Sequence, residues 1–127
     1  MKAKVRFFIC KHCGNVVEFI RDKGTQLVCC GDPMKELIPN TTDAATEKHV
    51  PVATLEGDKL TVKVGSVAHP MLPEHYIEWI AVITDKSLQR FYLDPGEKPE
   101  AVFTIADAEG AEVYEYCNIH GLWKTSL

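Results

Sequence analysis

The segregation of cysteine and histidine along the chain limits the possible folds more than any other feature. Four of the five cysteines lie in the first thirty residues, and Cys117 stands alone far from them. Histidine shows the reverse distribution, because only His12 lies in the first segment. Cysteine and histidine are the side chains that most often bind transition metals. The sequence therefore predicts two domains with two different metal sites: one with Cys10, Cys13, Cys29 and Cys30, the other with His49, His69, His75, Cys117 and His120.

The domain boundary is predicted near residue 38. Residues 1–38 are too few to bury a stabilising core, so a metal or a partner is expected to hold them. A polar, turn-forming stretch follows at residues 39–43 and is interpreted as a linker. Residues 39–127 are expected to form the second domain.

The alternation of apolar and polar residues predicts a mainly β protein. The runs in the first domain are residues 5–9, 16–20 and 26–28, and those in the second are 60–64, 76–84, 88–93, 101–105 and 112–117. Turn-forming residues separate the longer runs, as in an antiparallel β-sandwich. Helix is expected at most as a turn at residues 43–48.

Composition and charge exclude several classes of function. The net charge is −4, with Lys and Arg scattered, so a nucleic-acid-binding surface is not indicated. No apolar run is long enough to span a membrane. The short apolar run at residues 7–9 does not form a signal-peptide core, so a cytoplasmic location is expected.

The first four cysteines have the spacing of a tetrahedral four-thiolate site. Cys10 and Cys13 form a Cys-x-x-Cys pair, whereas Cys29 and Cys30 are adjacent and require a bent backbone to reach one ion. This spacing alone does not distinguish zinc from iron. Disulfides are disfavoured in the absence of an export signal. His12 is expected to be a solvated turn residue.

The second set consists of four histidines and one cysteine near turn residues. A blue-copper site would use two histidines, one cysteine and a weak axial Met, which leaves two histidines without a role. An iron site of two histidines and one carboxylate would leave Cys117 unexplained, and a zinc hydrolase site has fewer ligands.

Several motifs resemble those of one known family. The Cys10-x-x-Cys13 and Cys29-Cys30 segment is similar to desulforedoxin. The motifs that resemble the catalytic domain of the desulfoferrodoxin family are Glu47-Lys48-His49-Val-Pro, His69-Pro, His75-Tyr and Cys117-Asn-Ile-His120-Gly. The resemblance covers essentially the whole chain, with every expected ligand type in order.

This resemblance implies a homodimer with two irons per chain. Cys10, Cys13, Cys29 and Cys30 would hold a rubredoxin-like iron, and an immunoglobulin-like sandwich would carry the second. There His49, His69, His75 and His120 would be equatorial ligands and Cys117 the axial one. The implied activity is superoxide reductase, a detoxification that reduces superoxide to hydrogen peroxide, with a rubredoxin-like protein as electron donor.

Two further residues receive roles from the same resemblance. Lys48 would steer the anion and place a protonating water, and the carboxylate of Glu47 would occupy the sixth position once the iron is oxidised. The backbone N–H groups of Ile119 and His120 are expected to bond to the Cys117 thiolate. Alternatives are an electron-transport protein in which both irons only shuttle electrons, a zinc-stabilised binding module and a superoxide dismutase.

Overall fold

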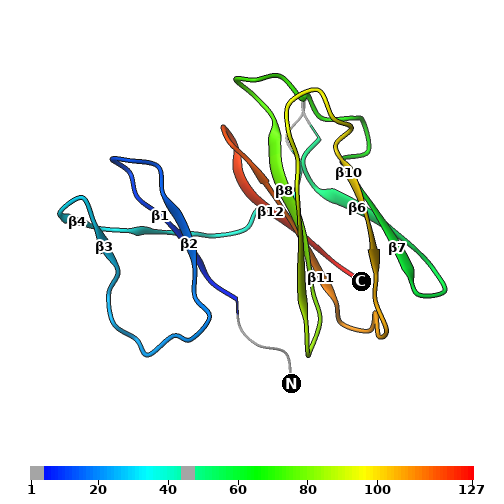
Figure 1. The fold of residues 1–127 in the computed structure, drawn as a ribbon, viewed down its shortest axis with the longest axis horizontal. Coiled ribbons are helices and arrows are strands. Elements are labelled where there is room, and N and C mark those ends of the chain that lie inside the picture. The colour runs from blue at the N-terminus through cyan, green and yellow to red at the C-terminus, as the bar shows by residue number, and fades with distance from the viewer. Residues whose placement is uncertain (1–4, 44–47) are drawn as a thin grey trace. The chain divides into compact units, whose positions relative to one another are not determined.

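The computed structural model describes residues 5–43 and 48–127 and divides the chain into two units. One unit comprises Ala3–Ile38, and the main stretch of the other is Pro39–Leu127 (Figure 1). Among the described residues every regular element is a β-strand, so the mainly β prediction is confirmed. None of these residues belongs to a helix that could cross a membrane. The single helical turn predicted at residues 43–48 falls largely outside the described residues.

The small unit is built from short strands around a turn-rich segment. Strand β1 (Phe7–Ile9) pairs with β2 (Val16–Glu18) on one side and β5 (Lys35–Leu37) on the other, and β3 (Val28–Cys29) pairs with β4 (Asp32–Pro33). Its described side chains include only two buried apolar ones, Phe7 and Cys10. As expected for so short a segment, packing alone contributes little to its stability.

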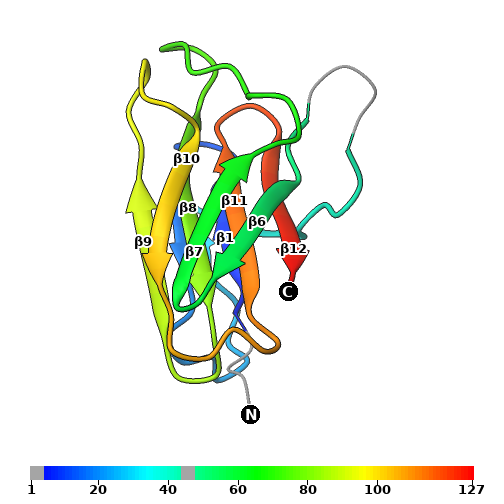
Figure 2. The ribbon, with the colours of Figure 1, turned by 90° about the vertical axis from the view of Figure 1, so that its right-hand side faces the viewer.

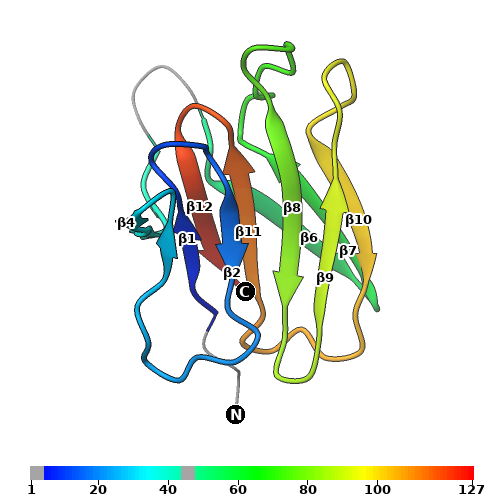
Figure 3. The same ribbon diagram turned by 60° about the vertical axis from the view of Figure 1, so that its left-hand side comes forward.

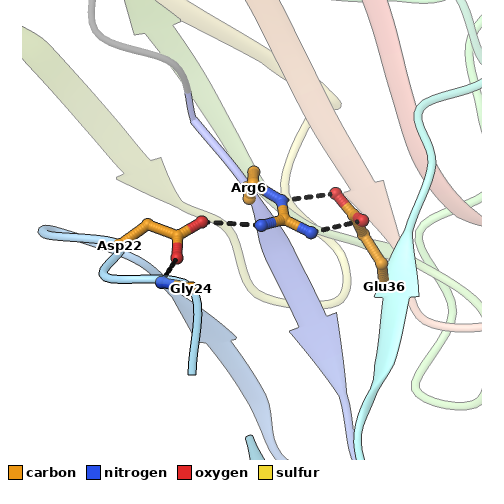
Figure 4. A network of polar contacts seen from close by, with 4 residues as sticks. All are labelled: Arg6, Asp22, Gly24 and Glu36. Carbon is orange, nitrogen blue, oxygen red and sulfur yellow. Dashed lines mark hydrogen bonds and ion pairs between the residues drawn. The ribbon is translucent and has the colours of Figure 1, made fainter. Parts of the chain in front are cut away.

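A network centred on Arg6 compensates in part for this small core (Figure 4). The Arg6 guanidinium donates two hydrogen bonds to the Glu36 carboxylate, at 2.8 and 3.0 Å, and a third to Asp22 at 2.6 Å. Asp22 also accepts the N–H of Gly24, at 2.8 Å. Such forked contacts fix geometry more strongly than single ion pairs. The network ties the start of β1 to the loop after β2 and to β5.

The larger unit is a sandwich of two antiparallel sheets (Figure 2). One sheet has the order β10-β7-β6, with β6 at Pro51–Glu56, β7 at Lys59–Val64 and β10 at Glu100–Thr104. The other has the order β12-β11-β8-β9, with β8 at Ile77–Ile83, β9 at Leu88–Tyr92, β11 at Glu112–Cys117 and β12 at Gly121–Ser126 (Figure 3).

Alternating side chains of these strands form the core. Leu60, Val62 and Val64 of β7 point inward, as their spacing predicts, and pack with residues of β8, β10 and β11. The edge strands β6 and β12 were not predicted.

Residues 39–43, predicted as a linker from their composition, also form backbone hydrogen bonds with the rest of the larger unit. The backbone N–H of Asn40 donates to Leu122, and its carbonyl accepts the N–H of Lys124, both at 2.9 Å. This stretch therefore pairs with β12.

Candidate metal centres

The four cysteines of the small unit converge on one point. Their sulfur atoms all lie within 4.8 Å of one another. Cys30 adopts a left-handed backbone conformation, with φ of 52°, which is uncommon for a residue with a side chain. This bend lets the adjacent Cys29 and Cys30 present their sulfurs to the same point, 4.0 Å apart.

Hydrogen bonding and crowding separate the pKa values of these thiols. The backbone N–H of Cys13 donates to the Cys10 sulfur at 3.5 Å and lowers the pKa of Cys10 to about 6. Hydrogen bonds with the Cys10 and Cys13 sulfurs raise the pKa of Cys29 to about 12. Four thiolates this close repel one another unless a cation lies between them. The cluster therefore fits a metal ion.

His12 lies outside this donor set. Its exposed ring contacts the Asp32 carboxylate, and the sequence prediction of a solvated turn residue is consistent with that exposure.

The second cluster gathers at one end of the sandwich. His49 precedes β6, His69 follows β7, His75 precedes β8, and Cys117 and His120 flank the turn between β11 and β12. Antiparallel pairing brings the start of one strand beside the end of its neighbour. Five donor atoms from three distant parts of the sequence consequently lie within 4.8 Å of one another.

The four imidazole rings form a closed ring of neighbours. Centroid distances are 4.5 Å from His49 to His69, 4.8 Å from His69 to His75, 5.0 Å from His75 to His120 and 4.8 Å from His120 back to His49. Each pair meets edge to face. His49 is therefore diagonal to His75, and His69 is diagonal to His120, as in the corners of a square.

The Cys117 sulfur lies at a similar distance from two opposite histidines of this ring. Its sulfur is 3.6 Å from Nε2 of His69 and 3.8 Å from Nδ1 of His120. The backbone N–H of His120 donates to the same sulfur at 3.5 Å, which confirms the expectation for that residue. The matching bond from Ile119 stays a prediction. The sulfur thus joins the four imidazoles as a fifth donor of the same cluster.

Neighbouring groups orient the histidine rings. Nδ1 of His69 lies 2.7 Å from the carbonyl oxygen of Pro70, which can only accept, so Nδ1 carries the proton. Its Nε2 then presents a lone pair, 3.0 Å from Nε2 of His49. Such convergence of electron-pair donors fits a cation. Trp123 stacks on the His49 ring and donates its indole N–H to the His120 carbonyl.

Asp43 and Gly65 fix the backbone at Lys48 and His49. Oδ1 of Asp43 accepts the N–H groups of His49, at 2.6 Å, and Val50, at 2.8 Å. A Cβ on Gly65 would lie only 2.6 Å from the Lys48 carbonyl oxygen. Lys48 is partly exposed beside the donor set, whereas Glu47 lies outside the described residues. Sequence reasoning missed Asp43 and Gly65, although an Asp or Gly next to a turn is a usual sign of such roles.

Glu115 is a carboxyl group buried between the sheets. Its side chain is fully buried, and no described residue forms a hydrogen bond with its carboxyl oxygens. Burial, with a smaller effect of the Asp43 charge, raises the pKa of Glu115 well above its usual value. Burial thus favours the neutral form of this carboxyl group, which buries no charge.

Two family models match consecutive parts of the chain. The model described as desulfoferrodoxin matches residues 41–126. The model of the desulfoferrodoxin N-terminal domain matches residues 3–37. Between them they cover both metal-site clusters.

Individual relatives and solved structures match over 74% or more of the chain. A desulfoferrodoxin homolog of Archaeoglobus fulgidus is 50% identical over 125 residues, covering 98% of this chain and 99% of the relative. A superoxide reductase of Pyrococcus horikoshii is 37% identical, covering 74% of this chain and 96% of the relative. The crystal structure of the superoxide reductase from Treponema pallidum superposes with a TM-score of 0.79 at 35% identity, covering 97% and 98% of the two chains.

Proposed function

Because the chain belongs to the desulfoferrodoxin family, we propose that it is a superoxide reductase whose catalytic iron is held by His49, His69, His75, His120 and Cys117. The observation that carries this assignment is the closed ring of four imidazoles with the Cys117 sulfur close to two of them. Imidazole nitrogens and a thiolate are suitable ligands for ferrous iron. A metal site of three histidines, or of two histidines and one cysteine, would not use all five donors.

The small unit carries the second iron. Its proposed ligands are Cys10, Cys13, Cys29 and Cys30, and the proposed domains are residues 1–38 and 39–127. Four thiolates suit iron or zinc, and membership of this family favours iron. The left-handed backbone at Cys30 makes a distorted tetrahedron the expected geometry.

The reaction consumes one superoxide, one electron and two protons and yields one hydrogen peroxide. The iron, when bound in the ferrous state, supplies the electron. Exposure differs across the site, because Cys117 is fully buried whereas His120 is exposed and His75 partly exposed. Superoxide is therefore expected to approach on the imidazole side and not through the sulfur.

Lys48 is the proposed steering and proton-relay residue. The net charge of −4 repels an anion at long range, so a local positive group beside the site raises the encounter rate. Lys48 directly precedes His49, and its backbone is fixed by contact with Gly65. An ammonium group there also orders a water that donates a proton to the reduced oxygen species. The proposed role of Glu47 is to supply a carboxylate to the sixth position after oxidation.

Cellular setting and partners form a further part of this proposal. None of the five cysteines is joined in a disulfide, which suits the reducing cytoplasm. The small unit exposes the apolar side chains of Ile20, Val28 and Ile38, which supports a homodimer. A rubredoxin-like protein is the proposed electron donor. Sedimentation velocity of the intact protein would test the dimer.

The deciding experiment mixes the reduced protein rapidly with superoxide and measures both products. A superoxide reductase forms one hydrogen peroxide per superoxide and no dioxygen. A dismutase forms half as much peroxide together with dioxygen, and an electron carrier shows no fast reaction. Metal analysis should find two irons per chain, whereas zinc in both sites would contradict the redox assignment.

A further inference from the structure

His75 is carried by a short turn that is closed on itself. The backbone N–H of Leu72 donates to the His75 carbonyl at 2.9 Å, and the N–H of His75 donates to the Leu72 carbonyl at 3.0 Å. The residues between them are Pro73 and Glu74. These reciprocal bonds define the shape of the turn. They do not attach it to the strands that carry the other donors.

Asn118 makes that attachment. Its side-chain oxygen accepts the N–H of Tyr76 at 2.9 Å, and its side-chain nitrogen donates to the Glu74 carbonyl at 3.0 Å. Its backbone N–H donates to the Tyr76 carbonyl at 3.2 Å. Asn118 thus bonds to the residues on both sides of His75, and it is itself the residue that follows Cys117.

We infer that Asn118 is a positioning residue that sets His75 relative to Cys117 and His120. Its amide binds two residues of the segment around His75, which are 42 and 44 residues away in sequence. An asparagine amide offers an acceptor and a donor on one rigid plane, which suits the Tyr76 N–H and the Glu74 carbonyl together. Asn118 acts through backbone and touches neither substrate nor metal.

The register of the sheet explains why this bridge is needed. Cys117 pairs with Ile77 where the β8–β11 ladder is irregular, between Tyr116 and Cys117. Regular pairing therefore ends before it reaches His75. Asn118 extends the contact between β8 and β11 past that irregularity, to Tyr76, which is next to His75.

The inference rests on the proposed five-ligand iron site and makes a separate prediction about it. Residues that orient ligands typically change metal affinity by about 10- to 100-fold when they are replaced. Because Asn118 is exposed, water competes for its bonds and the lower end of that range applies. Asn118→Ala should release the catalytic iron about tenfold faster than wild type. The backbone bond to Tyr76 remains, so the variant should fold.

The test compares three variants of the iron-loaded protein. Asn118→Ala removes both side-chain bonds, and Asn118→Asp keeps the acceptor for Tyr76 but places oxygen against the Glu74 carbonyl. Asn40→Ala is the matched control, since the Asn40 amide also donates to a backbone carbonyl, that of Leu122 at 3.3 Å. The measurements are iron release to a chelator, hydrogen exchange of residues 71–78 and the melting temperature.

Three results together would support the role of Asn118. Asn118→Ala should show faster exchange at residues 71–78 and faster iron release, and Asn118→Asp should give intermediate values. Asn40→Ala should behave as the wild type. Wild-type exchange and release in Asn118→Ala, or equal changes in Asn40→Ala, would overturn this role. Failure of the iron site itself is distinguishable, because the wild-type protein would then bind no iron beyond that of the four cysteines.

Discussion

Oδ1 of Asp43 lies 2.6 Å from the backbone nitrogen of His49, so a residue outside the donor set fixes the backbone of a proposed ligand. Asp43→Ala should weaken iron binding at the second site about tenfold, because His49 loses its anchor. Asp43→Asn retains an acceptor oxygen and should have a smaller effect. Competition with a chelator measures both. The matched control is Asp107→Ala, which removes a similar bond to the Glu109 N–H, and an equal loss there would contradict the prediction.

Gly65→Ala should move Lys48 and slow the reaction with superoxide. The new Cβ meets the Lys48 carbonyl oxygen at 2.6 Å, and relief of such overpacking costs about 1–3 kcal/mol. Gly110→Ala is the control, because it introduces strain at a φ of 71° with open space around the Cβ. Stopped-flow rates should fall in the first variant only. Equal rates would show that the position of Lys48 does not matter.

Lys48→Ala should lower the second-order rate constant with superoxide roughly tenfold and flatten its dependence on ionic strength. The physical reason is the loss of the local positive charge from a protein of net charge −4. Lys48→Arg should keep most of the salt dependence. Lys86→Ala, in the exposed turn between β8 and β9, controls for net charge. An unchanged salt slope in Lys48→Ala would remove this residue from the mechanism.

Cys117→Ser should abolish the thiolate-to-iron charge-transfer band of the oxidised catalytic centre, because the serine oxygen is a poorer electron donor. The spectrum of the first centre should persist. Cys30→Ser is the reciprocal control and should alter the first spectrum only. Visible absorption before and after oxidation measures both. A surviving band in Cys117→Ser would show that this sulfur is not a ligand.

Glu115→Gln should flatten the decrease in stability as the pH rises from about 5. The folded-state pKa of Glu115 is raised, so above the usual value of 4.5 the native state keeps a proton that the unfolded state loses. The free energy of unfolding then falls by up to about 1.4 kcal/mol per pH unit until the folded-state pKa is reached. Denaturant unfolding of both iron-loaded proteins between pH 5 and 8 gives the difference. Parallel curves would contradict a neutral Glu115.

The sequence predicts the fold best where alternation is strong. The range predicted at residues 60–64 lies within β7, and residues 112–117 coincide with β11. Four of the strands in the described residues were missed: β4 and β5 of the small unit, and β6 and β12 of the larger one. Strands β6 and β12 lie at sheet edges and begin with Pro51 and Gly121, residues that weaken the strand signal. These two strands follow His49 and His120. Because these strands were not predicted, the sequence did not indicate which strand pairings bring the two histidines together.

The ligand types could be predicted from residue identity, but their supports could not. Cys117 and His120 form a recognisable spacing, whereas Asn118 acts through hydrogen bonds to backbone groups 42 and 44 residues away. Pattern reasoning does not encode such contacts because they depend on register. The pairing of residues 39–43 with β12 was missed for the same reason, since a polar turn-rich stretch has the composition of a linker.

The separation of the donors along the chain has a consequence for biosynthesis. All four cysteines of the first site have been synthesised once residue 30 is complete, so that site can form while most of the chain is still being translated. The second site needs donors from His49 to His120 and both sheets of the sandwich. Long-range contacts of this kind form late in folding. The donors of the cysteine site are therefore complete before those of the second site have been synthesised.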